Sequence, residues 1–138
     1  MCDLHSVCIL TFSKHSNGSA NIIDRSEERK VDLIPLTMKP GYEFALTNRV
    51  RRTVPAKESF DAWFARPEDV IVGKLMTWKE GRSFKHELDI RDILVAIRSG
   101  EDMELTALFD FDSLERWTGR LGSKVIELGQ KLKGTDAD

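Results

Sequence analysis

The sequence predicts an α+β domain, with a small and mostly antiparallel N-terminal sheet of about three to five strands followed by a C-terminal set of four or five helices. Two observations support this prediction. Before residue 66, short apolar runs alternate with turn signals such as Asn17-Gly18 and Pro40-Gly41, which is typical of strands and hairpins. From residue 66 onward, apolar residues recur at intervals of three and four, which is typical of amphipathic helices.

Length and composition favour one globular domain. The chain has 138 residues, and we expect a single domain over residues 1–133, with strands in 1–65, helices in 66–133 and a disordered tail at 134–138. Lysine and arginine number 21 against 23 acidic residues, so the net charge of −2 does not indicate nucleic-acid binding. No apolar run is long enough for a membrane span or a secretory signal, and we therefore expect a cytoplasmic protein. Cys2 and Cys8 are expected to be free thiols.

The strand half contains one unusual carboxylate. Residues 5–13 are compatible with a strand, and the runs 19–24 and 30–36 predict a hairpin. Alternation along the second run places Asp32 on one face with Ile34 and Leu36. A carboxylate beside apolar residues needs a cation, a metal or a hydrogen-bond donor to stay charged, which would suit a binding site. The structural explanation is that Asp32 lies on a solvent-exposed edge strand or forms an ordinary pair with an arginine. Both explanations remain open from the sequence.

Basic residues precede the last predicted strand. Residues 42–48 predict a short helix, and residues 59–64 predict the last strand. Between them, Arg49, Arg51 and Arg52 form a cluster. Phosphate binding explains the cluster, and so does an edge strand that uses charge to prevent pairing with another sheet.

The first long helix is expected to begin at Pro67, where a missing N–H costs nothing, with Glu68 and Asp69 at the positive end of the helix dipole. Its apolar stripe consists of Val70, Ile71, Leu75 and Trp78. Lys74 lies within this stripe, so its ammonium group either reaches solvent along an apolar stem or faces an anion.

The second long helix is expected after a break at Gly81, with Ser83 as its cap and Gly100 at its end. Its apolar face consists of Ile90, Ile93, Leu94 and Ile97. His86 and Asp89 lie on or beside that face and need partners. We expect His86 to be a hydrogen-bonded core residue. Asp89 either pairs with Lys74 or forms part of a site.

Smaller helices are expected to close the domain. Residues 102–109 predict a short helix or loop, and Asp110 or Asp112 is expected to cap the next helix, Asp112 in a capping box with Glu115. The inner faces of the last two helices are predicted at Leu114, Trp117 and Leu121, and then at Val125, Leu128 and Leu132.

Three segments together resemble a known group of proteins. PEDVIVGKL (67–75), KHELDIRDIL (85–94) and FDFDSLERWTGRLG (109–122) resemble the C-terminal part of bacterial nucleotidyltransferase-fold proteins related to the AbiEii-like nucleotidyltransferases. The upstream segment NIIDRSEERKVDLIPL (21–36) resembles the strand pair that supplies the third active-site acid of that group, and Asp32 matches this acid. The resemblance covers roughly residues 20–132.

The resemblance implies a site for a nucleoside triphosphate and Mg²⁺. Asp32 would be a catalytic residue and metal ligand, Lys74 would contact phosphate, and Asp89 would orient the ligand or act in proton transfer. Arg51, Arg52 and Lys85 would bind the nucleotide.

The matching segments lack the Gly-Ser element and the Asp-x-Asp strand that hold the metal ions in this group. An alternative alignment uses Gly18-Ser19 with Lys30-Val31-Asp32, but it places a lysine at the first metal-binding acid. We therefore expect an incomplete nucleotidyltransferase-like domain that retains phosphate or nucleotide binding, with little or no autonomous transfer. The alternative is a non-catalytic interaction module, which forms a homodimer or binds a partner protein through an exposed sheet edge, by way of residues 5–13.

Overall fold

The computed structural model describes residues 10–16 and 18–134. Cys2, Cys8, the beginning of the predicted 5–13 strand and all but the first residue of the predicted 134–138 tail lie outside the described residues. The chain is α+β, as the sequence predicts. It divides into two compact units, one ending at Pro40 and one beginning at Gly41, and each is described separately below. The expectation of one domain over 1–133 stays a prediction.

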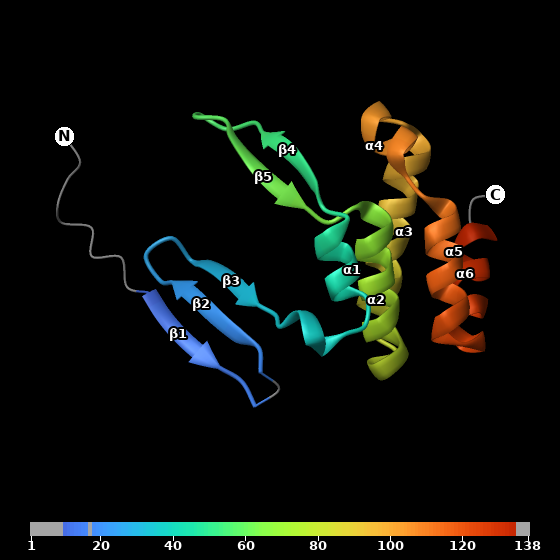
Figure 1. Ribbon diagram of the computed structural model, residues 1–138, viewed down its shortest axis with the longest axis horizontal. Helices are drawn as coiled ribbons and strands as arrows, with labels where there is room; N and C mark the ends of the chain where they lie inside the picture. The colour runs from blue at the N-terminus through green and yellow to red at the C-terminus, as the bar shows by residue number, and fades with distance from the viewer. Residues whose placement is uncertain (1–9, 17, 135–138) are drawn as a thin grey trace. The chain divides into compact units, whose positions relative to one another are not determined.

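The first unit is a three-stranded antiparallel sheet with the order β1-β2-β3 (Figure 1). Its elements are β1 (Leu10–Lys14), β2 (Ala20–Asp24), β3 (Arg29–Leu33) and the short 3-10 helix η1 (Leu36–Met38). The predicted hairpin of the two runs is confirmed as β2 and β3, with Ile22 opposite Val31.

Strand β3 is shorter than predicted. It ends at Leu33, two residues before Pro35, which cannot donate to a strand ladder and precedes η1. The predicted alternation over 30–36 is therefore wrong beyond Leu33, and neither Ile34 nor Leu36 extends the strand that carries Asp32.

The second unit consists of a hairpin and a group of helices (Figure 1). Its elements are α1 (Tyr42–Thr47), β4 (Val50–Val54), β5 (Phe60–Phe64), α2 (Pro67–Gly81), α3 (Phe84–Ser99), α4 (Met103–Leu108), α5 (Phe111–Leu121) and α6 (Ser123–Gly134). The predicted short helix at 42–48 and the predicted last strand at 59–64 are confirmed. Strands β4 and β5 form an antiparallel sheet of their own, so the described strands divide into two sheets rather than one.

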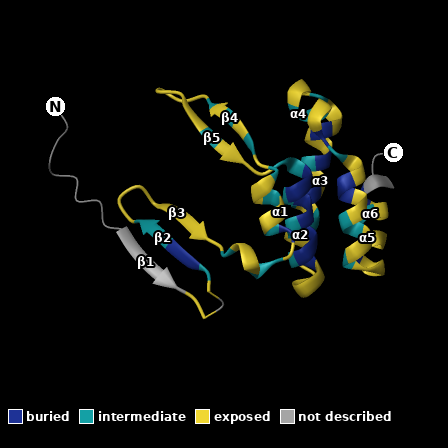
Figure 2. Ribbon diagram, in the orientation of Figure 1, coloured by how far each residue is buried: buried dark blue, intermediate teal, exposed yellow. Residues whose placement is uncertain are grey.

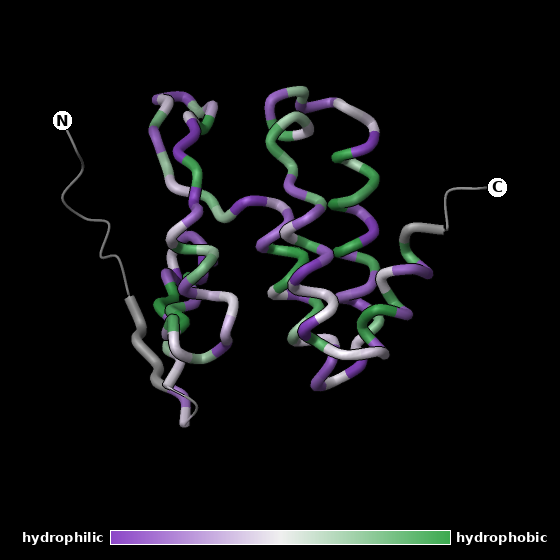
Figure 3. Tube along the Cα trace, turned by 45° about the vertical axis from the view of Figure 1, so that its right-hand side comes forward, coloured by the Kyte–Doolittle hydropathy of each residue, from purple (hydrophilic) through white to green (hydrophobic). Residues whose placement is uncertain are grey.

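The core of the second unit lies between α2, α3, α5 and α6, while the hairpin is mostly exposed (Figure 2). Hydrophobic and hydrophilic residues alternate along these helices, so each turns an apolar face inward (Figure 3). The buried apolar residues are Ile71, Val72, Leu75, Met76, Trp78, Ile90, Leu94, Ile97, Phe109, Leu114, Val125, Leu128 and Leu132. The stripes predicted from helical spacing therefore form one core, except for Val70, which is half-buried and lies outside it.

The boundary between α2 and α3 lies where the sequence predicts it. Helix α2 ends at Gly81, and Arg82 after it takes the left-handed conformation, with φ of 53°. The Arg82 N–H donates to the Trp78 carbonyl at 2.6 Å, and its guanidinium lies 4.5 Å from the centre of the Trp78 ring, so two contacts stabilise this conformation. Ser83 precedes α3, but its hydroxyl makes no capping hydrogen bond.

At the ends of the later helices, two predicted caps are confirmed and a predicted capping box is wrong. Gly100 ends α3 with φ of 67°, as expected for a glycine at this position. Asp110 caps α5 by accepting a hydrogen bond from the Ser113 N–H at 2.7 Å. Because α5 begins at Phe111, Asp112 lies inside its first turn, and the predicted capping box with Glu115 does not form.

None of the helices in residues 10–16 and 18–134 is long and apolar enough to cross a membrane.

Candidate functional site

Lys74 and Asp89 form an ion pair between α2 and α3. Lys74 Nζ lies 2.6 Å from Asp89 Oδ2, and the two side chains are 28% and 31% exposed. Of the alternatives that the sequence left open, the pairing of Lys74 with Asp89 is therefore confirmed. The hydrogen bond from Lys74 is the main cause that lowers the pKa of Asp89 below its ordinary value, so this carboxylate is ionised at neutral pH.

Lys85 and His86 add positive charge next to this pair. They precede Asp89 on α3 by four and three residues, and the charges of both groups lower the Asp89 pKa further. The buried Nδ1 atom of His86 has no hydrogen-bond partner in the described part of the chain, which departs from the expected hydrogen-bonded core histidine. We refer to Lys74, Lys85, His86 and Asp89 as the Lys74 cluster. Its net charge is positive even without the histidine, because it contains two lysines and one aspartate.

Asp32 belongs to the first unit and has polar neighbours. The Asn21 side-chain amide donates to Asp32 Oδ1 at 2.5 Å, and Lys30 Nζ lies 3.0 Å from the same oxygen. Its side chain is 54% exposed on β3, which is an edge strand of the sheet. The expected apolar surroundings are wrong, because the register places Asp32 opposite Asn21. That Asp32, Lys74 and Asp89 surround one ligand stays a prediction.

Arg51 and Arg52 each have carboxylate partners. Arg51 lies 2.8 Å from Asp61 of the neighbouring strand, while Arg52 lies 2.9 Å from Asp102 and 3.4 Å from Glu104 at the start of α4. Both arginines line a cavity of about 290 Å³ that also contains Arg66 and Glu68. Because the guanidinium groups are already paired, this cavity offers no excess positive charge to an anion.

The sequence did not reveal the buried acids at the start of α2. Glu68 is 1% exposed, and Arg66 Nη1 lies 3.2 Å from its Oε1 atom, while Arg66 Nε lies 3.0 Å from Asp69 Oδ2. Neither carboxylate oxygen of Glu68 has a hydrogen-bond partner of good geometry among the described residues. Burial raises the pKa of Glu68, and the charge of Arg66 opposes this effect only in part. The signal in the sequence was the three-residue spacing of Arg66 and Asp69, which places them on one side of a helix.

The donor set around Asp32 does not fit a magnesium site. The groups that contact this carboxylate are an amide nitrogen and an ammonium, whereas Mg²⁺ takes oxygen ligands. Within the described ranges, 10–16 and 18–134, no three His, Cys, Asp or Glu side chains are grouped as metal ligands. The function proposed below therefore includes no step that depends on a metal.

Comparisons of the chain with protein-family models, with curated proteins and with solved structures found no match. The resemblance to the nucleotidyltransferase-fold proteins remains a prediction from the motifs alone.

Proposed function

We propose that the chain is a non-catalytic binding domain that takes a phosphate-bearing ligand at the Lys74 cluster. The observation that supports this proposal is the Lys74–Asp89 ion pair, with Lys85 and His86 within one turn of Asp89 on α3. Two ammonium groups and an imidazole provide hydrogen-bond donors for phosphate oxygens, and Asp89 neutralises only one of the positive charges. The proposal keeps the cytoplasmic location expected from the sequence.

The ion pair prepares Lys74 for this role. Asp89 fixes the position of the Lys74 ammonium at 2.6 Å, so less side-chain freedom is lost when a ligand binds. Lys85 and His86 lie in the first turn of α3, where the helix dipole also favours an anion. The resembled family suggests a nucleoside triphosphate as the ligand. Transfer is not part of the proposal, because the matching segments lack the acids that would bind two metal ions.

Titration of the full chain with ATP and with pyrophosphate, each with and without Mg²⁺, tests this proposal. Calorimetry and amide chemical shifts measure the binding. Lys74→Met removes a charged hydrogen-bond donor, which is worth about 1.5 kcal/mol or more and should weaken binding at least about tenfold. Lys79→Met is the matched control, because Lys79 is an exposed lysine on the same helix. Absence of saturable binding, or equal loss in both variants, would reject the site.

Incubation with labelled nucleoside triphosphates, Mg²⁺ and candidate protein or RNA acceptors tests the non-catalytic part of the proposal separately. We expect no label on any acceptor. Robust transfer that disappears in Asp32→Asn would show that the chain has a working active site.

A second candidate function is an interaction module, and the exposed aromatic residues of β5 favour it. Phe60, Trp63 and Phe64 are 55%, 59% and 43% exposed, and the two-stranded sheet has unpaired edges. An unpaired edge beside exposed aromatic residues is a surface on which another chain can pair. Sedimentation equilibrium should then show a homodimer, or a capture experiment should yield a partner protein. Phe60→Ser should weaken this association. A monomer at high concentration with no partner would count against this function.

A further inference from the structure

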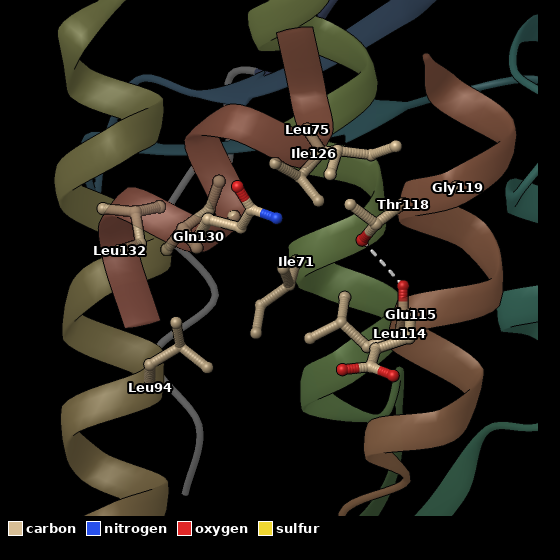
Figure 4. A pocket seen from close by; sticks show the side chains of 12 residues that line it. Ile71, Leu75, Leu94, Leu114, Glu115, Thr118, Gly119, Ile126, Gln130 and Leu132 are labelled. Carbon is tan, nitrogen blue, oxygen red and sulfur yellow. Dashed lines mark hydrogen bonds between the residues drawn. The ribbon is translucent and has the colours of Figure 1, made fainter. Parts of the chain in front are cut away.

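A cavity of about 260 Å³ lies between α5 and α6 and extends to α2 and α3 (Figure 4). None of the residues of the Lys74 cluster lines it. Its inner wall is apolar and consists of the buried residues Ile71, Leu75, Ile90, Leu94, Leu114 and Leu132. The cavity opens to solvent between α5 and α6, where its lining residues Glu115, Gly119, Ile126 and Gln130 are exposed. A ligand that enters it would therefore remove the apolar inner wall from water.

Polar groups lie only at the mouth of this cavity. The side-chain amide of Gln130 points into it, and Glu115 lies at its edge (Figure 4). The Thr118 hydroxyl donates its proton to the Leu114 carbonyl at 2.7 Å, so its oxygen can only accept a further hydrogen bond. Among the described residues that line the cavity, none is basic. The mouth therefore presents acceptor oxygens from Gln130, Glu115 and Thr118, and of these side chains only the Gln130 amide nitrogen offers a donor. This balance, with the charge of Glu115, favours a head group that donates hydrogen bonds and disfavours an anion.

We propose that this cavity binds a small aliphatic molecule whose neutral or cationic head donates hydrogen bonds. The hydrocarbon part lies among the isoleucine and leucine side chains, and the head reaches Gln130 and Glu115. A cavity of 150 Å³ accommodates benzene, so this volume fits a ligand of about ten non-hydrogen atoms. Octanol and octylamine have this size and this chemistry, whereas octanoate has the size but an anionic head.

Methyl chemical shifts of the full chain during titration with octanol, octylamine and octanoate provide the test. We expect saturable shifts at Leu94 and Ile126 with octanol or octylamine, and much weaker shifts with octanoate. The tighter binder of octanol and octylamine shows whether the cavity prefers a neutral or a cationic head. No saturable shift with either donor ligand, or equal binding of octanoate, would overturn the proposal.

A cavity-filling variant supplies the structural control. A Cβ atom at Gly119, on the cavity wall, would meet no other atom within 4 Å, so Gly119→Leu should be accommodated and should abolish binding. Gly81→Leu is the matched control, because a Cβ there also meets nothing within 4 Å and Gly81 does not line the cavity. Unchanged binding in a folded Gly119→Leu would refute the site.

A second variant keeps the test decisive if Gly119→Leu fails to fold. Gln130 is exposed, so Gln130→Lys should fold normally and place a cation at the mouth. We expect this variant to favour octanoate over octylamine. If the order of the three ligands does not change, their heads do not lie at Gln130 and the proposed orientation is wrong.

Discussion

Removal of the Arg66 charge should strongly destabilise the second unit. In Arg66→Met, Glu68 and Asp69 would lose their cation while their side chains stay 1% and 2% exposed. Breaking a buried ion pair on one side usually costs 3–5 kcal/mol, and the 19% exposure of the Arg66 side chain favours the lower end, about 3 kcal/mol. A domain of this size has a total stability of roughly 5–15 kcal/mol, so the loss is easily measured.

Urea unfolding followed by tryptophan fluorescence measures this loss. Trp63, Trp78 and Trp117 all belong to the second unit, so the signal reports on that unit alone. Arg51→Met is the matched control, because the Arg51–Asp61 pair is 62% and 43% exposed and such pairs contribute about 1 kcal/mol or less.

Two further measurements identify the cause of the loss. The cost of Arg66→Met should shrink at acidic pH, because the unpaired carboxylates can then take up protons. The triple variant with Glu68→Gln and Asp69→Asn should regain most of the lost stability, since no charge remains buried. A loss as small as that of Arg51→Met at neutral pH would refute the argument that Arg66 compensates buried charge.

Three other substitutions test the electrostatics and the helix ends. Glu68→Gln should stabilise the second unit at neutral pH, because burial raises the pKa of Glu68. The stability that protonated Glu68 contributes in the wild type is complete below the unfolded pKa and is lost as pH rises through the folded pKa. Urea unfolding at several pH values across this range should show this dependence in the wild type and not in the variant. In Lys74→Met, the lowered pKa of Asp89 should return toward its ordinary value, as ¹³C NMR of the carboxyl group can show. The stability that the ionised Asp89 contributes in the wild type is present above the unfolded pKa and is lost as pH falls through the folded pKa, so the variant should lack this acid dependence. Asp110→Ala should cost about 1 kcal/mol through the lost cap of α5, whereas Asp112→Ala should cost much less, and equal losses in thermal unfolding would contradict the assignment of Asp110 as the cap.

The fold class and the helical core were predictable because their signals are local and periodic. Pro67 and Gly100 mark the ends of the α2–α3 pair, and residues such as Ile71, Ile90 and Val125 recur at helical spacing on the buried faces. The division of the strands into two sheets was not predictable, because hairpin signals specify which strands are neighbours along the chain but not which hairpins join.

The ion pairs were only partly predictable. The pairing of Lys74 with Asp89 was one of two alternatives that the sequence left open, because each residue lies on or beside the apolar face of its own helix and a buried charge needs a partner. The burial of Glu68 could not be predicted in the same way. Acids in the first turn of a helix are usually exposed, and it is the tertiary packing around the start of α2 that buries Glu68.

Arg52 joins the β4–β5 hairpin to the start of α4 through Asp102 and Glu104. This connection consists of charges at the surface, and concentrated salt shortens their range to about 3 Å at 1 M. High ionic strength should therefore loosen the hairpin while the apolar core of the helices stays intact, so amide hydrogens of β4 would exchange faster and those of α2 would not. We therefore expect the hairpin to move without disturbing the helical core.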